Sequence, residues 1–492
     1  MLFNSIHFLI FFPIVVCVYF LIPSRIKYIW LLIASYYFYM CWNPKYIVLI
    51  GISTIVTYVS GLLIEKFTMR KRWIVAGSFI TNLGILAFFK YFNFIYINVE
   101  QVLHHCGITI PSSHYDIILP VGISFYTFQA LSYTVDVYRG EIKAEHNILK
   151  YALFVSFFPQ LVAGPIERSK NLLQDIQDIP KKKMLDYNRI TSGLTIMLYG
   201  MFLKLVIADR ISIVVDTVFD QYKKYDSIAL LIAAVCFSIQ IYCDFSSYST
   251  IAIGAARVMG FTLMENFDTP YFATSIKDFW RRWHISLSTW FRDYLYIPLG
   301  GNRCSKARKY FNLLVTFAAS GLWHGAGWSY IVWGMLHGIY QIIGELLVPV
   351  KNWICKICKV KKETFSYKLM QMLITFFLVT FAWIFFRADS FRTALGFIYR
   401  MLTAWSFNTL ISEGFLKMGL SFLEWNILLV ALAFMFGISL IKYRRQMTID
   451  TFLAEQNRWF RWSVLYLLLF AILIYGKYGP AYDQQAFIYF QF

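Results

Sequence analysis

"NLLVTFAASGLWHGAGWSYIVWGMLHGIYQIIGELLVPV", residues Asn312–Val350, is an apolar stretch that contains an ionisable imidazole, His324. As a helix, the apolar residues before His324 cover only about 18 Å, whereas the hydrocarbon core of a bilayer is about 30 Å thick. The turn "HGAG" is followed by a second apolar run, Ser329–Val350. This pattern predicts a helical hairpin that holds His324 inside a membrane, where an idle titratable group would be costly.

The composition of the whole chain also indicates a membrane protein. Of its 492 residues, 59% are hydrophobic and only 15% are charged. The net charge of +19 comes from short Lys/Arg clusters between apolar runs. Scattered clusters of this kind report membrane topology, so we expect a lipid bilayer as a partner and no nucleic acid. The fold class that follows is an all-α polytopic membrane protein.

The positions of the basic clusters predict how the chain crosses the membrane. The first apolar run lacks a basic n-region and a small-residue cleavage site, so we expect a retained span. If the clusters at Arg25 and Lys27 and at Lys66–Arg72 are cytoplasmic, the N-terminus is extracytoplasmic, and the cytoplasmic cluster Lys442–Arg445 before the last span places the C-terminus outside as well. His104, His105 and His114 then fall in an external loop as solvated residues. The predicted apolar segments are 5–22, two more separated by "NPK" (43–45), 73–99, 117–135, 190–215, 228–249, the hairpin, 369–386, 425–441 and 462–478.

Some segments do not suit a lipid-facing helix. "FFPQLVAGPIER", residues 157–168, combines two prolines and a glycine with apolar residues, which predicts a re-entrant or broken helix. Charged residues interrupt the next apolar segments and must face protein or water. They are Lys204, Asp209, Arg210 and Asp244. The eight cysteines are scattered without a zinc pattern, so no metal is expected, and residues 1–492 are predicted to form one membrane-embedded domain.

A second histidine, His284, lies in "SIKDFWRRWHISLSTWFRDYLYIPLGG", residues 275–301. Apolar residues recur there at spacings of three and four, which predicts one amphipathic helix that ends at Pro298. Lys277, Arg281 and Arg292 share its polar side. His284 falls at the border of the two faces, where it either anchors the helix at the interface or points into a cavity.

The two histidines suit acyl transfer. Burial keeps an imidazole neutral, and a neutral imidazole can take a proton from an attacking hydroxyl. The alternative for His324 is a core histidine bonded to a backbone carbonyl, and His337 on the return helix is expected to be structural. No GxSxG, HExxH, Walker or dinucleotide-binding motif is present.

The segments quoted above, residues 157–168, 275–301 and 312–350, together with "YCDFSSYSTIAIGAARVMGF" (242–261), resemble the membrane-bound O-acyltransferases. In particular, they resemble the bacterial alginate O-acetyltransferase-like branch of that family. The resemblance covers most of the chain. It implies a funnel-like bundle of about eleven membrane helices, with His324 and His284 as the catalytic histidines. It also implies a cytoplasmic thioester donor such as acetyl-CoA, an acceptor outside, no bound cofactor and a bacterial inner (plasma) membrane location.

The function expected from this resemblance is O-acetylation of a secreted or cell-envelope polysaccharide, completed by an extracytoplasmic SGNH-type acetyltransferase partner. Transfer of D-alanyl or another acyl group to teichoic acid, lipid or protein remains open. A transporter or flippase would also explain buried charges, but the paired halves typical of transporters are absent.

Two further groups of residues are candidates for the donor and acceptor sides. Lys277, Arg281, Arg282 and Arg292, with the cluster 303–309, form a basic rim that could attract the phosphates of coenzyme A. Positive-inside bias explains the same charges. In the extracytoplasmic tail 479–492, the last six residues, "FIYFQF" (487–492), carry a single phenol, Tyr489, which is either an interfacial anchor or a transient acyl relay.

Overall fold

The computed structural model describes residues 1–108, 117, 119–411 and 414–478. All regular secondary structure in these residues is helical, which confirms the predicted class. The described residues form two compact units. The first combines Met1–Met197 with Ile251–Met264, and the second combines Leu198–Thr250 with the described residues from Glu265 onward.

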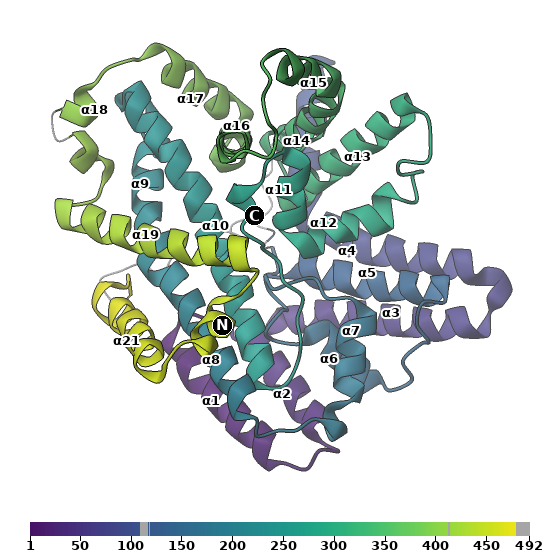
Figure 1. Cartoon of the computed structure of the whole chain (residues 1–492). Coiled ribbons are helices and arrows are strands. Elements are labelled where there is room, and N and C mark those ends of the chain that lie inside the picture. Colours follow the sequence, from purple (N-terminus) through teal and green to yellow (C-terminus); the bar gives the residue numbers. More distant parts are fainter. Residues whose placement is uncertain (109–116, 118, 412–413, 479–492) are drawn as a thin grey trace. The chain divides into compact units, whose positions relative to one another are not determined.

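The first unit contains seven complete helices and most of an eighth, and α3, α4 and α5 lie side by side (Figure 1). Two of these helices meet through polar side chains, since the Ser53 hydroxyl of α3 donates to Asn82 Oδ1 of α4 over 2.6 Å. Such hydrogen bonds join helices that pack within a membrane. The helices are α1 Ile6–Leu21, α2 Lys27–Met40, α3 Ile47–Lys66, α4 Lys71–His105, α5 Ile123–Arg139, α6 Ile148–Ser156, α7 Ser169–Gln177 and α8 Tyr187–Phe202.

The second unit carries both candidate histidines and is built around the α13–α14 hairpin. α8 continues through a π-helical turn, Leu203–Ala208, into α9. The helices are α9 Asp209–Asp220, α10 Ser227–Val258, which ends in the first unit, α11 Ile276–Arg282, α12 Ile285–Phe291, α13 Lys306–His324, α14 Trp328–Leu346, α15 Val348–Ile357, α16 Phe365–Arg387, α17 Phe391–Thr403, α18 Asn408–Ile411, α19 Phe422–Arg445, α20 Ile449–Glu455 and α21 Arg458–Tyr475.

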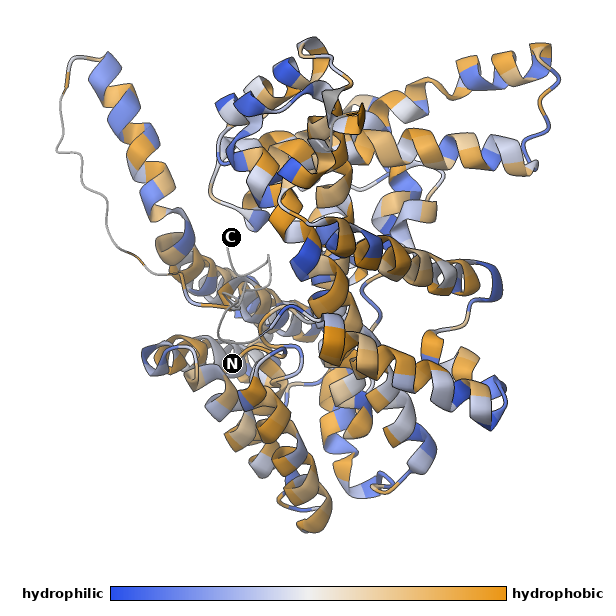
Figure 2. Ribbon diagram, turned by 90° about the vertical axis from the view of Figure 1, so that its left-hand side faces the viewer, coloured by the Kyte–Doolittle hydropathy of each residue, from blue (hydrophilic) through white to orange (hydrophobic). Residues whose placement is uncertain are grey.

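Seven helical segments of the described chain are long and apolar enough to cross a membrane, or eight if α14 and α15, which bend by 49°, form one span. Apolar residues run along most helices, and hydrophilic residues gather at several connecting turns (Figure 2). The protein is therefore a multi-pass membrane protein, while the predicted count of eleven spans is not confirmed. α1 is apolar but has only 16 residues.

Several predicted boundaries change. α13 begins at Lys306, so its 19 residues cover about 28 Å rather than 18 Å. α4 extends to His105, which places His104 and His105 on its last turn. His114 lies outside the described residues. α5 begins at Ile123 instead of Ile117. The amphipathic helix α17 was not predicted, because its polar face hides it from a search for apolar runs.

The two irregular features predicted from the sequence are present. Residues 157–168 form a non-helical, mostly buried connection between α6 and α7. Lys204 and its two carboxylate partners are each at most 3% exposed. The ammonium of Lys204 lies 2.8 Å from Asp209 and 2.6 Å from Asp244. The Arg210 guanidinium donates to the carbonyl oxygens of Val206 and Tyr475. These charges face protein, as expected.

Candidate active site

Glycines bring α13 and α14 close enough together to hold His324 in the hairpin. A Cβ atom at Gly321 would clash with the carbonyl oxygen of Tyr330, and one at Gly334 would clash with that of Phe317. Small residues allow this close approach of two helical backbones in a membrane. The hairpin therefore has the form predicted from the "HGAG" turn, with His324 as the last residue of α13.

The position of His324 determines its tautomer. The imidazole is 2% exposed, and its Nδ1 atom lies 2.6 Å from the carbonyl oxygen of Ser320, one helical turn earlier. A carbonyl oxygen only accepts hydrogen bonds, so Nδ1 carries the proton and Nε2 carries the lone pair. The backbone bond expected for a core histidine is thus present, and it also leaves the ring with a basic Nε2.

The predicted amphipathic helix around His284 is wrong at its centre. The chain forms α11, breaks at Trp283 and His284, and resumes as α12, which passes into a π-helical turn at Arg292–Tyr296. His284 has φ +44° and ψ +54°, a left-handed conformation. Histidine is enriched there compared with most side chains, but a residue held in this region is still strained. Strain of this kind clusters at functional sites.

The break turns His284 into the protein, so the interfacial-anchor alternative does not hold. Its side chain is fully buried against Phe245 of α10, with ring centroids 4.6 Å apart. The rings of His284 and His324 have centroids 6.3 Å apart. Tryptophans 323 and 333 pack edge-on against His324. The fold thus brings the two candidate histidines together inside an aromatic enclosure.

The sequence did not single out a third member of this cluster, Asn266. Its Oδ1 atom lies 3.1 Å from Nδ1 of His284. The two helices that flank His284, α11 and α12, are not among the segments long and apolar enough to span a membrane. Burial lowers the pKa of His284 well below its usual value, and the neighbouring His324 lowers it further. The imidazole of His284 is therefore suited to the neutral state.

His337 has different surroundings. It is fully buried on α14 among the rings of Phe279, Trp280 and Trp333. Neither of its ring nitrogens has a hydrogen-bond partner among the described residues. Its contacts are those of a packing side chain, as expected.

The basic residues predicted to bind the donor fall into two groups. Lys277 and Arg281 are exposed, one turn apart on α11. Arg282 instead pairs with Asp278 and Asp268, at 3.0 and 3.7 Å. Arg292 lies 2.7 Å from its neighbour Asp293. The structure thus leaves Lys277 and Arg281 together on one face and engages the other two with carboxylates.

Two other predictions, the Tyr489 relay and the absence of a metal, are not tested by the geometry of this site. Tyr489 and the rest of the tail 479–492 lie outside the described residues. Among the residues that the structure describes, no group of three or more His, Cys, Asp or Glu side chains is arranged to hold a metal ion, and all eight cysteines are free thiols.

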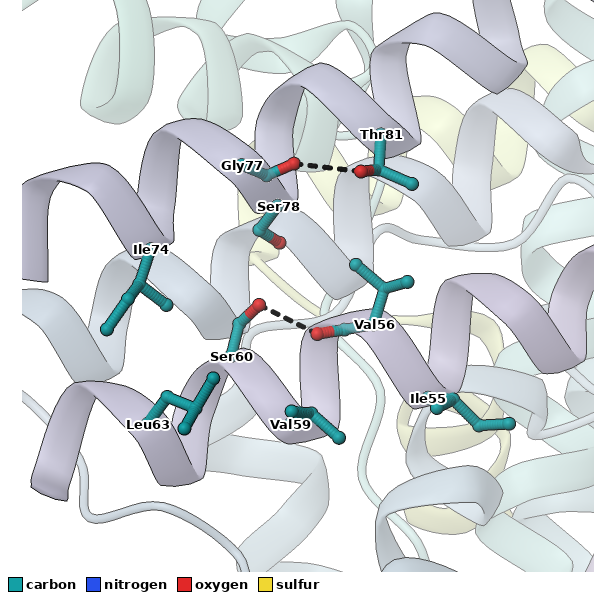
Figure 3. A pocket seen from close by; sticks show the side chains of 9 residues that line it. All are labelled: Ile55, Val56, Val59, Ser60, Leu63, Ile74, Gly77, Ser78 and Thr81. Carbon is teal, nitrogen blue, oxygen red and sulfur yellow. Dashed lines mark hydrogen bonds between the residues drawn. The ribbon is translucent and has the colours of Figure 1, made fainter.

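A groove of about 400 Å³ opens between α3 and α4 (Figure 3). Its lining is mainly aliphatic, with Ser60, Ser78 and Thr81 as its hydroxyl groups. The Ser60 hydroxyl donates to a backbone carbonyl of its own helix. The groove belongs to the first unit, and none of its lining residues is acidic or basic.

The site defines a class of protein before any relative is considered. Two neighbouring buried imidazoles in a multi-pass membrane protein, of which His324 has its lone pair on Nε2, suit an enzyme that removes a proton from a hydroxyl. Residues 139–350, which include both histidines, match the family described as MBOAT, membrane-bound O-acyltransferase family.

Relatives match far more of the chain. The "Probable alginate O-acetylase AlgI" of Pseudomonas aeruginosa is 39% identical over 415 residues, which cover 83% of this chain and 76% of the relative. The "Peptidoglycan O-acetyltransferase" of Helicobacter pylori is 35% identical over 439 residues, covering 82% and 80%. The "Teichoic acid D-alanyltransferase" of Bacillus subtilis is 28% identical over 298 residues, covering 57% and 73%.

The chain belongs to the membrane-bound O-acyltransferase family. It is therefore an acyltransferase, which confirms the resemblance drawn from the sequence and favours acyl transfer over the transporter or flippase alternative.

Proposed function

We propose that this protein moves an acetyl group from cytoplasmic acetyl-CoA across the membrane for O-acetylation of a cell-envelope polysaccharide. The observation that carries the proposal is the buried pair of His284 and His324, with ring centroids 6.3 Å apart. Its setting, in a chain 35–39% identical to alginate and peptidoglycan O-acetylating relatives, supports acetyl as the acyl group and a polysaccharide as the acceptor.

In this mechanism the acceptor hydroxyl attacks the thioester carbonyl carbon. Nε2 of His324 takes the hydroxyl proton as the new C–O bond forms, and the C–S bond then breaks. The proton passes from the imidazolium to the leaving thiolate, which departs as coenzyme A thiol. Nε2 of His284 accepts a hydrogen bond that orients the reacting hydroxyl. No metal or bound cofactor is needed for these steps.

The donor phosphates would meet the exposed pair Lys277 and Arg281. We expect charge reversal of both, Lys277→Glu with Arg281→Glu, to raise KM for acetyl-CoA about tenfold, with a smaller change in kcat. Initial rates at varied acetyl-CoA concentration measure this. Reversal of exposed Arg392 on α17 is the matched control. An unchanged KM in the Lys277/Arg281 variant would assign these charges to topology alone.

Arg282 is a poor choice for this test, although the sequence suggested it. Its guanidinium pairs with Asp278 and Asp268, so charge reversal would place three carboxylates together. A loss of activity there would report a damaged α11 rather than donor binding.

On the acceptor side we propose that Tyr489 carries the acetyl group outward. A phenol is a better leaving group than a sugar alkoxide, so acetyl-tyrosine would be a reactive relay. An extracytoplasmic SGNH-type acetyltransferase would transfer the acetyl group to the polymer. This arrangement requires the C-terminal tail outside a bacterial inner membrane, and the positions of the basic clusters support both termini there.

The relay predicts a specific product. After incubation with acetyl-CoA, mass spectrometry of the C-terminal peptide should show one added acetyl group on Tyr489, absent from His324→Ala. Tyr489→Phe should lose polymer acetylation, whereas Tyr478→Phe, a second phenol of the same end of the chain, should retain it. Normal polymer acetylation by Tyr489→Phe would limit the tail to an anchoring role.

The whole proposal is tested by incubating purified protein with labelled acetyl-CoA, alone and with extracytoplasmic partners and polysaccharide, and following the label. A parallel reaction with a D-alanyl carrier-protein thioester tests the alternative that the teichoic acid relatives suggest. Label from acetyl-CoA but not from D-alanine supports O-acetylation, and the reverse would replace it with D-alanylation.

A further inference from the structure

The side chain of Asn266 is the centre of a buried hydrogen-bond network in the second unit. Asn266 is 1% exposed and lies in the connection between α10 and α11. Its Oδ1 atom accepts from the backbone N–H of Ser286 over 3.2 Å and from the Ser286 hydroxyl over 2.9 Å. Its Nδ2 atom donates to the hydroxyl of Ser249 on α10 over 3.1 Å. Both the oxygen and the nitrogen of the side-chain amide are therefore hydrogen-bonded.

This network fixes which atom of Asn266 faces His284. A backbone N–H can only donate, so the amide atom beside the Ser286 nitrogen must be the oxygen. The same oxygen lies 3.1 Å from Nδ1 of His284. Because an amide oxygen only accepts, Nδ1 of His284 must carry its proton, and the lone pair of the neutral ring is then on Nε2.

The backbone of Asn266 also holds the break at which His284 sits. Its carbonyl oxygen accepts from the N–H of Ile285 over 3.0 Å. Two residues later, the N–H of Asp268 donates to the carbonyl of Arg282 over 2.9 Å. These two bonds bracket the left-handed residue. One short segment thus sets both the strained backbone and the ring tautomer of His284.

We propose that Asn266 is a positioning residue for acyl transfer, which holds His284 in the tautomer whose Nε2 atom can accept a hydrogen bond from the reacting hydroxyl. This inference rests on the proposed function of His284. With the other tautomer, Nε2 would carry a hydrogen and could not accept. Ser249 in turn holds the amide of Asn266.

A purely structural role makes a different prediction. Asn266 also satisfies the first N–H groups of α12, so its loss could weaken the fold without affecting chemistry. Asn266→Asp separates the two roles, because a carboxylate keeps an acceptor for both Ser286 and His284.

His324 is the titratable group that faces His284 from α13, Phe245 faces it from α10, and Asp268 of its own connection pairs with Arg282.

The test uses the full-length protein in lipid nanodiscs and compares kcat/KM for acetyl transfer across pH. Asn266→Ala should lower kcat/KM about 10- to 100-fold, as found for outer partners of oriented histidines. Asn266→Asp should recover activity at high pH, with the acidic limb of the profile moved up by about one unit. The sign follows because a carboxylate beside Nδ1 favours the imidazolium, while catalysis needs the neutral ring. Thr289→Ala is the matched control and should change kcat/KM less than threefold, because the Thr289 hydroxyl of α12 donates only to the carbonyl oxygens of Ile285 and Ser286 and does not contact Asn266.

A double-mutant cycle decides the outcome. His284→Ala and His284→Ala with Asn266→Ala should have equal activity, because Asn266 acts through His284. If the losses of activity caused by the two substitutions multiplied in the double variant, the inference would be overturned. A parental rate of acetyl transfer by a folded Asn266→Ala protein would overturn it as well. If Asn266→Ala does not fold, an unmoved pH profile in Asn266→Asp overturns it instead. Normal activity of His284→Ala would refute the role proposed for His284 itself, which is a separate result.

Discussion

His324→Ala is expected to lower the turnover of acetyl transfer by about 100- to 10,000-fold, the contribution of a positioned general base. The imidazole is anchored through Nδ1 to the carbonyl of Ser320, so the lone pair that we propose as the base is on Nε2. Alanine removes that lone pair and with it the proposed base. KM for acetyl-CoA should change much less than kcat, because the donor contacts proposed above are at Lys277 and Arg281.

The matched control is another buried imidazole of the same hairpin. His337→Phe replaces a ring that packs against Phe279 and Trp280 and whose nitrogens have no hydrogen-bond partner in the described structure. Its activity should stay near parental, since a ring of similar shape keeps the packing and removes two unpaired polar atoms. Near-normal turnover by a folded His324→Ala protein would remove His324 from the role of base. An equal loss in His337→Phe would show that the assay reports packing of the hairpin instead.

The hairpin around His324 could be predicted because length and hydropathy decide it. An apolar run too short to cross, a Gly-rich turn and a second run leave the chain few alternatives in a bilayer. The structure extends the first helix back to Lys306, since basic residues at a helix end reduce hydropathy without preventing helix formation. The approach of α13 and α14 also follows from local sequence, because Gly321 and Gly334 lie at the points of closest contact.

The break at His284 could not be predicted in the same way. The apolar spacing runs through it without interruption, and neither glycine nor proline marks the position. What holds the left-handed residue is tertiary, namely Asn266 from the preceding connection and Phe245 from α10. Asn266 was missed because "ENFDTP" reads as a polar connection. The separation of Arg282 from Lys277 and Arg281 depends in part on Asp278, four residues earlier on α11, which helical spacing could have indicated. Its second partner, Asp268, is related to α11 by no helical periodicity.

The second large effect is expected at Lys204. Its ammonium is 1% exposed and contacts Asp209 and Asp244 at 2.8 and 2.6 Å. Lys204 and Asp209 are five residues apart across the π-helical turn, which is the hydrogen-bond spacing of a π-helix. This spacing places their side chains on the same side of the helix. Lys204→Met would leave two carboxylates buried beside each other. Breaking a buried ion pair in this way costs about 3–5 kcal/mol, so the variant should accumulate poorly and melt well below the parent.

Compensation distinguishes charge from packing at this site. Lys204→Met combined with Asp209→Asn and Asp244→Asn removes all three charges at similar volume, and it should restore accumulation and thermal stability, because a neutral replacement of a buried ion pair is often tolerated. Lys368→Met, which breaks the exposed pair with Glu363, is the control and should cost less than about 1 kcal/mol. Expression and melting in detergent measure stability, and acetyl transfer by the triple variant measures function separately. Parental stability of Lys204→Met would mean that the pairs do not stabilise the fold. A stable but inactive triple variant would instead assign these charges a part in the reaction. Stability would then need only that the buried charges balance, whereas activity would need the charges themselves.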